Sequence, residues 1–543
     1  MKLSAVLALC LAAGSAFAQM QMAPKPPALM PGLSNLHHPV TTSSAEAQQF
    51  FDQGLRLVYA FNHDEAARAF HRAAELDPKM AMAWWGVALA VGPNYNLPVD
   101  PEHEKIAVEA IDKAKSLGAF ASQIEKDYID ALGRRFTHQT NPNYQQLNAD
   151  YAKAMHELAA KYPDDLDAAT LYADSMMNLR PWKLWNPDGT PAPGTEEIVS
   201  TLESVLRRDP NHIGAMHLYI HAVEASPHPE RALSYADRIP QLAPAAGHLV
   251  HMPAHIYERT GNYDGARAQN VSAAKADEDY ASSTGMQGIY TMMYYSHNLH
   301  FGAIAASMQG RCADAQSQAD RLADNVRPGL KEMPMLEAFA AIPLAVSVRC
   351  QRWDSLLAMN EPAAQTPVLK AFWLYSRGNA LAARGKVAEA EGMQKQLAAI
   401  EAATPADDIF MPPIQNHSRQ IFHIANTVLS ARIAAAKGDK ARAIDQFKDA
   451  VANQDQLLYD EPADWYYPVR ESLGGLLLQN GDAKAAEAVF RRDLEMNPRN
   501  PRSLFGLHEA LTRQNRTYEA EWVKQQLDTA WQGADTQLRV EDL

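Results

Sequence analysis

One polar pattern, H-x3-H-x2-E, occurs twice in this chain, and the two copies lie 34 residues apart. Its members are His217, His221, Glu224, His251, His255 and Glu258. Spacings of four and three place such side chains on one stripe of a helix. Recurrence over this distance is typical of folds built from repeated helix pairs, in which equivalent residues of neighbouring repeats lie side by side. The pattern therefore predicts stacked repeats that bring four imidazoles and two carboxylates together.

Small and aromatic residues recur along most of the chain at the spacings of a helix–turn–helix repeat. One early register contains Gly54, Ala66, Phe70, Ala73 and Pro78, and one late register contains Gly474, Gly481, Ala486, Phe490 and Pro498. These residues resemble the consensus of the tetratricopeptide repeat (TPR). The resemblance implies an all-α chain whose antiparallel helix pairs stack into a right-handed superhelix, an α-solenoid, with a concave groove. No segment has the pattern of a strand.

The first 45 residues differ in composition from the repeats that follow. Lys2, an apolar stretch over 3–13 and the small residues Ala16 and Ala18 predict a secretory signal peptide over 1–18, cleaved after Ala18. A linker rich in proline and methionine is expected over 19–45, and the repeats over 46–543. No later segment offers about 18 uninterrupted apolar residues, so we expect no membrane span and a periplasmic or secreted protein.

The net charge and the cysteine content limit which partners the chain can bind and which cellular compartment it suits. The net charge of −14, without a basic stripe, argues against binding to nucleic acid. Two cysteines, Cys312 and Cys350, follow the predicted signal peptide, and both fall at turns between helices of neighbouring repeats. A disulfide between them suits an oxidising compartment, and two separate buried thiols are the alternative.

The repeat register places the histidines and glutamates on one face. Repeats that begin at Ile213 and Gly247 carry the two copies of the pattern, and a third repeat begins near Ser296. In tetratricopeptide proteins the equivalent positions of the first helix line the concave groove, so the resemblance implies that these side chains converge there. The predicted metal ligands, in repeats over about 212–310, are His217, His221, Glu224, His248, His251, His255, Glu258, His297 and His300.

The donor set of this cluster suits a transition metal. Imidazoles spaced i, i+4 chelate well, because one helical turn separates them by about the distance between two ligands of one ion. Nitrogen and oxygen donors without thiolates fit copper, zinc, iron or manganese, and mostly imidazole ligation in an exported protein favours copper. The number of histidines predicts a dinuclear or larger centre, and glutamates that are not ligands would orient imidazole N–H groups. The alternative is a groove whose histidines and glutamates bond to each other or hold a peptide.

Several functions remain open for such a site. Leu218 and Met252 stand where a zinc peptidase has its base glutamate, which disfavours that mechanism. An enzyme would be a metal-dependent oxidoreductase, with copper favoured, acting on a small molecule in the groove; a hydrolase using Glu224 or Glu258 as base is the weaker option. A non-enzyme would store or deliver metal, or act as a scaffold for a peptide or protein partner.

Two insertions flank the histidine repeats, one over 181–195 and one over 281–295. Long loops in compact arrays are often functional. Trp182, Trp185, Tyr294 and Tyr295 are therefore expected either to form walls of a pocket or to anchor the loops in the core.

Overall fold

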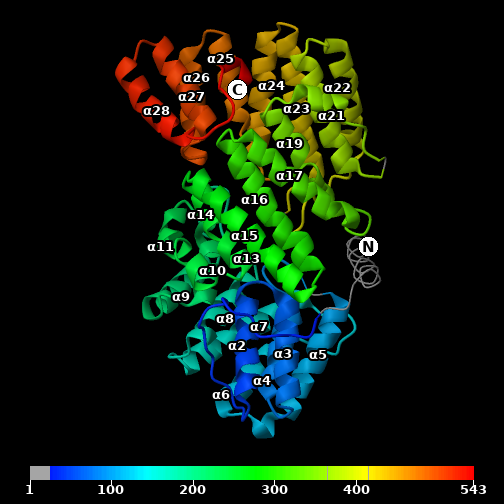
Figure 1. Ribbon diagram of the computed structural model, residues 1–543, viewed down its shortest axis with the longest axis vertical. Coiled ribbons are helices and arrows are strands. Elements are labelled where there is room, and N and C mark those ends of the chain that lie inside the picture. Colours follow the sequence, from blue (N-terminus) through cyan, green and yellow to red (C-terminus); the bar gives the residue numbers. More distant parts are fainter. Residues whose placement is uncertain (1–24, 99, 364, 414) are drawn as a thin grey trace. The chain divides into compact units, whose positions relative to one another are not determined.

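The structure is a computed structural model that describes residues 25–98, 100–363, 365–413 and 415–543. Within these ranges every extended regular element is a helix, and β-structure is limited to two isolated bridges (Figure 1). Consecutive helices pair and stack as in a helical-repeat α-solenoid, which confirms the predicted all-α fold. The predicted signal peptide lies outside the described residues.

The chain divides into two compact units. The first contains residues up to Ile256 together with Ser272–Tyr295, and the second contains Tyr257–Val271 together with Ser296–Leu543. The boundary therefore runs through helices α14 (Pro253–Arg259) and α15 (Tyr263–Thr284).

The first unit holds the predicted metal-site repeat that begins at Ile213 and part of the one that begins at Gly247. Its elements are α2 (Ala45–Tyr59), α3 (His63–Leu76), α4 (Ala81–Val91), α5 (Pro101–Ser116), η1 (Gly118–Phe120), α6 (Gln123–Leu132), α7 (Tyr144–Lys161), α8 (Leu166–Met177), α9 (Thr195–Arg208), α10 (Ile213–Glu224), η2 (Pro229–Ala232), α11 (Leu233–Ala236), α12 (Ile239–Leu242), α13 (Gly247–His251) and the π-helical η3 (Tyr290–Tyr294).

Close packing between neighbouring repeats explains the small residues of the sequence pattern. Phe70 of α3 is fully buried, and a Cβ added to Gly54 of α2 or Gly86 of α4 would lie 2.6 or 2.3 Å from its ring. The side chain of Asn62 caps α3 by accepting from the backbone N–H of Glu65. A large ring thus fills the space that two glycines leave between adjacent helices.

The second unit repeats this arrangement. Its elements are α16 (Tyr295–Met308), α17 (Cys312–Val326), η4 (Arg327–Gly329), η5 (Pro334–Leu336), α18 (Glu337–Ala340), α19 (Ile342–Arg349), α20 (Trp353–Ala358), α21 (Pro367–Ala383), α22 (Val387–Ala403), α23 (Ser418–Ala436), α24 (Lys440–Gln454), α25 (Val469–Gln479), α26 (Ala483–Met496), α27 (Pro501–Arg513), α28 (Thr517–Ala530) and η6 (Val540–Asp542). Phe490 packs against Gly474 and Gly506 as Phe70 does in the first unit. A disulfide joins Cys312 to Cys350, as the first of the two readings predicted.

The described part of the predicted linker, residues 25–44, is bonded to the first unit instead of forming a free tether. We call this segment the N-terminal strap. Nδ1 of His37 lies 2.8 Å from Asp52, and Nδ1 of His38 lies 2.8 Å from Asp167. The hydroxyl of Thr41 donates to Glu125 at 2.6 Å. Buried carboxylates of several helices therefore hold the strap in place.

The histidine repeats depart from regular helix pairs where prolines occur. Helix α13 ends at His251, and α14 begins at Pro253, because proline has no N–H to continue the helical ladder. After α10, Pro229 and Pro240 leave only the short turns η2, α11 and α12 in place of a second helix. The sequence register had predicted one continuous first helix from Gly247.

No helix among the described residues combines the length and the apolar character needed to cross a membrane.

Candidate metal centre

The first unit brings five histidines and one glutamate into a single buried cluster. Helix α10 supplies His217, His221 and Glu224, α13 supplies His248 and His251, and α14 supplies His255. None of these six side chains is more than 3 % exposed. Both copies of the H-x3-H part of the pattern, and one of its two glutamates, therefore meet inside this unit.

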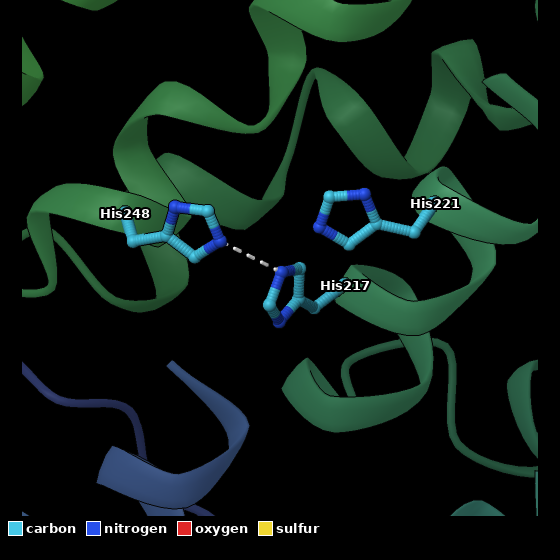
Figure 2. A group of neighbouring side chains, drawn as sticks. All are labelled: His217, His221 and His248. Carbon is cyan, nitrogen blue, oxygen red and sulfur yellow. Dashed lines mark hydrogen bonds between the residues drawn. The ribbon is translucent and has the colours of Figure 1, made fainter. Parts of the chain in front are cut away.

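Three imidazoles form the first group, which we call the imidazole trio: His217, His221 and His248 (Figure 2). One nitrogen of each ring lies within 4.8 Å of the others. Nε2 of His217 and Nε2 of His248 are 3.1 Å apart. Ligand nitrogens about 2.0–2.1 Å from one ion lie about 3.3–3.5 Å from each other, so small side-chain movements would let the trio share an ion.

Hydrogen bonds on the opposite side of two rings determine which nitrogen faces the trio's centre. Nδ1 of His217 donates to the main-chain carbonyl of Tyr59 at 2.7 Å, and Nδ1 of His221 donates to Glu224 at 2.8 Å. Because a carbonyl and an ionised carboxylate only accept, both neutral rings carry their lone pair on Nε2. Nε2 of His221 is buried and has no hydrogen-bond partner among the described residues.

Glu224 connects the trio to a second pair of imidazoles. Its other oxygen lies 2.5 Å from Nδ1 of His255, whose Nε2 is 2.8 Å from Nε2 of His251. Glu224 thus accepts from Nδ1 of His221 and lies against Nδ1 of His255, and this turns Nε2 of each ring toward other imidazoles. This is the orienting role that a carboxylate plays behind metal-bound histidines.

The electrostatic environment keeps these rings in the form that binds metal. Burial lowers the pKa of His217 well below its usual value, and the neighbouring His221 lowers it further. Burial also lowers the pKa of His221, although Glu224 opposes this effect. Burial alone would raise the pKa of Glu224, but His255 and His221 bring it below the usual value. The result at neutral pH is uncharged imidazole beside ionised carboxylate.

Aromatic rings enclose the trio. The ring of Phe61 has its centroid 4.3 Å from that of His217, 5.9 Å from that of His221 and 5.4 Å from that of His248. Trp182 lies 5.7 Å from His221, and Tyr294 lies 4.9 Å from His248. Trp182 and Tyr294 of the two insertions therefore pack against the trio, and their role as walls of a pocket remains a prediction.

The other two insertion aromatics have their own partners in the first unit. Trp185 donates from its indole N–H to the main-chain oxygen of Ala222 at 2.8 Å, and Tyr295 donates to Glu278 at 2.9 Å. These contacts fit the loop-anchoring alternative.

Three of the predicted ligands, Glu258, His297 and His300, belong to the second unit. His300 lies against the rings of Phe339 and Tyr466 at 5.6 and 6.2 Å, and burial lowers its pKa to about 3. His297 packs on Phe301 at 5.0 Å. The assignment of these three residues to a metal remains a prediction.

Phe61 and Tyr95 are members of the site that the sequence reasoning did not identify. Tyr95 is buried, with its ring 5.6 Å from His221 and 5.1 Å from Trp182. No motif marks Tyr95. Phe61 carries one signal, because it stands two residues before the second helix of its repeat, where many repeats have glycine.

A second group of potential ligands, His38, Asp165 and Asp167, also lies in the first unit. Asp167 accepts from His38 at 2.8 Å and from the hydroxyl of Tyr59 at 2.7 Å, and it lies 3.2 Å from Nε2 of His212. The hydroxyl of Tyr128 donates to Asp165 at 2.8 Å. These carboxylates already accept several hydrogen bonds, so the group fits a structural role in holding the strap.

Comparisons with known proteins find similar solved structures but no matching family. No protein-family model matches the sequence, and no curated protein matches it. Among solved structures, a human IFIT1 dimer with m7Gppp-AAAA is similar over 90 % of this chain and 91 % of that chain, with 11 % identity and a TM-score of 0.36. Yeast Tom70 is similar over 90 % of this chain and 91 % of that chain, with 12 % identity and a TM-score of 0.28.

Proposed function

We propose that this protein is a transition-metal-binding helical-repeat protein whose ion is held by the imidazole trio in the first unit. The observation that carries the proposal is Nε2 of His221, a buried ring nitrogen that points a lone pair at two other imidazoles and lacks a hydrogen-bond partner among the described residues. Burying an acceptor without a partner costs free energy, and bonding to an ion would recover it.

The hydrogen-bonded alternative explains the cluster less well. A network without metal would pair each ring nitrogen with a donor or acceptor, as Asp167 pairs with Nδ1 of His38 in the N-terminal strap. Here Glu224 binds Nδ1 of two rings and leaves their Nε2 atoms to face other imidazoles. That arrangement turns the lone pairs on Nε2 of His217, His221 and His255 toward the inside of the cluster. Two of them are hydrogen-bonded to His248 and His251, where a cation would take the place of the shared proton.

The donor set favours copper, with zinc second. The trio offers nitrogen only, and imidazole suits both ions. The pair His251 and His255, joined to the trio through Glu224, would supply ligands for a second ion. A dinuclear centre is therefore part of the proposal, with Glu224 between the two ions.

Burial favours an ion that stays in place over one that is delivered. His217 and His221 are 0 and 3 % exposed, so a chelator would need a local opening of the helices to reach the ion. We further propose export from the cytoplasm, which the sequence of the first 18 residues and the Cys312–Cys350 disulfide support.

Metal analysis of the full chain, expressed with its leader and without an affinity tag, tests the proposal. Metal content would be measured by inductively coupled plasma mass spectrometry for the wild type and for a His217→Phe/His221→Phe variant, in which phenyl rings replace imidazoles of similar size. His508→Phe is the matched control, because it replaces a part-buried histidine of the second unit that is not among the predicted ligands.

We expect at least one equivalent of copper or zinc in the wild type and in the control, and a loss of about one equivalent in the double variant. An unaltered metal content in the double variant, or no metal after reconstitution of the wild type with copper, zinc, iron and manganese, would refute the proposal. Either outcome would leave binding of a peptide or protein, as a scaffold, as the remaining function.

A further inference from the structure

An aromatic side chain occupies a backbone position of the repeat that elsewhere carries glycine. In eight helix pairs the residue two places before the second helix has a positive φ. Five of these residues are glycine: Gly261, Gly310, Gly385, Gly438 and Gly481. The other three are Gln351, Asn515 and Phe61, with φ of 53°, 59° and 55°. A left-handed backbone is unfavourable for a bulky side chain, so Phe61 needs a compensating interaction.

That interaction is with the imidazole trio. Phe61 is buried, and its ring lies nearly parallel to those of His221 and His248, at 9° and 17°, while it meets His217 edge-on. Trp182 also has a positive φ, 60°, and contacts His221 from its own loop. Strained backbone of this kind persists where the surroundings determine it, and it is concentrated at functional sites. Two strained aromatic residues thus contact the trio: Phe61 lies against all three imidazoles, and Trp182 lies against that of His221.

These walls limit how many ligands an ion in the trio can have. Phe61 contacts all three rings, and hydrocarbon supplies neither a ligand nor a hydrogen-bond partner for a bound water. Zn²⁺ in proteins is almost always four-coordinate, and Cu²⁺ prefers tetragonal sites with at least four ligands. Monovalent copper has a filled d shell and accepts three ligands. An aromatic face also attracts a cation through its quadrupole.

The charge of the site leads to the same ion. Glu224 is the carboxylate in contact with the trio, through its 2.8 Å hydrogen bond from Nδ1 of His221. When the trio alone holds an ion, this one negative charge balances a monovalent ion, whereas a divalent ion would leave an uncompensated positive charge in a buried site. The cost of burying an unpaired charge is large and rises with that charge.

We infer that the imidazole trio is a three-coordinate site for monovalent copper, selected over Zn²⁺ and Cu²⁺ because Phe61 closes the fourth coordination position. This inference rests on the proposed function and specifies the ion and its oxidation state. Phe61 acts here as a specificity-determining residue that touches the ligands.

Phe61→Gly is the informative variant, because glycine is the residue that five other repeats have at this turn. It should open the fourth position without straining the backbone. Asn515→Gly is the matched control, since it introduces glycine at the equivalent turn of a repeat in the second unit. Circular dichroism melting would verify that both variants fold.

Affinities of the full chain for Cu⁺, with ascorbate under nitrogen, and for Zn²⁺ would be measured by competition with chromophoric chelators. The wild type and the Asn515→Gly control should prefer Cu⁺, and Phe61→Gly should shift the Cu⁺/Zn²⁺ affinity ratio toward zinc by at least about tenfold. X-ray absorption of the copper-loaded wild type should show three nitrogen ligands.

The possible results distinguish failure of this inference from failure of the proposed function. A wild type that binds Zn²⁺ or Cu²⁺ at the trio with four ligands, or a Phe61→Gly variant that folds and keeps the wild-type ratio, would overturn the inference while metal binding stands. X-ray absorption of the wild type remains decisive if Phe61→Gly fails to fold. If metal binding does not depend on His217 and His221, both the inference and the proposed function are overturned.

Discussion

Glu224→Gln changes one atom of the cluster and tests whether the carboxylate orients two metal ligands. The side chain is 1 % exposed, and its oxygens lie 2.8 Å from Nδ1 of His221 and 2.5 Å from Nδ1 of His255. Glutamine retains the shape but has a single acceptor oxygen and an NH2 group. Its NH2 would face an N–H of one imidazole, which two donors cannot share.

The mismatch moves a proton within one ring. If His221 or His255 shifts its proton from Nδ1 to Nε2, Nδ1 can accept from the amide, but Nε2 loses the lone pair that the metal needs. Loss of such an orienting partner costs about 10–100-fold in metal affinity. At about 1.4 kcal/mol per tenfold, the expected loss of binding free energy is about 1.4–2.8 kcal/mol.

The assay is a competition titration of Cu⁺ and Zn²⁺ against chromophoric chelators at constant pH. Glu125→Gln serves as the control, because Glu125 is also a buried carboxylate of the first unit that accepts from several donors, at Thr41 and Ser122. It should leave metal affinity unchanged. Equal affinities of wild type and Glu224→Gln, with an intact fold, would refute the assignment of Glu224 as the group that orients the ligands.

Three further predictions concern stability, each measured by urea unfolding. Burial raises the pKa of Asp174 from 3.8 to about 6, so the folded state holds this proton more tightly than the unfolded state does. The resulting contribution to the free energy of unfolding is full below pH 3.8 and is lost as the pH rises through about 6. Asp174→Asn should therefore stabilise by about 1–3 kcal/mol at pH 8 but not at pH 3.5, and equal effects at both pH values would contradict this account. Removing the disulfide by Cys312→Ala/Cys350→Ala releases a link across 38 residues and should cost up to about 4 kcal/mol, so an unchanged midpoint would count against it. Gly86→Ala should destabilise by about 1–3 kcal/mol because the new Cβ meets a ring 2.3 Å away. Gly392→Ala, in an open helical position, should instead stabilise by about 0.5–1 kcal/mol, and like signs for the two glycine variants would contradict the packing argument.

The sequence predicted those parts of the molecule that follow from periodicity. The recurrence of glycine, alanine and phenylalanine gave the helix pairs, since one ring such as Phe70 fills the space left by two glycines. The predicted start of the repeat at Ile213 is also the first residue of α10. Spacing alone brought His217, His221 and Glu224 onto one face of a helix, because that depends only on helical geometry.

Features that depend on local breaks or on long-range contacts were not predictable. The helix is interrupted between His251 and Pro253 because of the proline, whereas the repeat register predicts an unbroken helix there. Tyr95 lies in no motif and reaches His221 only through tertiary packing. Phe61 could have been found, because an aromatic residue at a glycine position of a repeat is a local conflict that usually has a functional reason.

The N-terminal strap has a consequence for how the first unit unfolds. In an ordinary solenoid each repeat contacts its neighbours only, so end repeats can fray and folding can begin anywhere. Here His38 bonds to Asp167, 129 residues away, and Lys25 bonds through its backbone N–H to Thr284. These links connect the start of the unit in sequence to its middle and its end. Opening one end therefore breaks bonds at the other, and the first unit should melt as one cooperative block with a higher contact order than a simple repeat array.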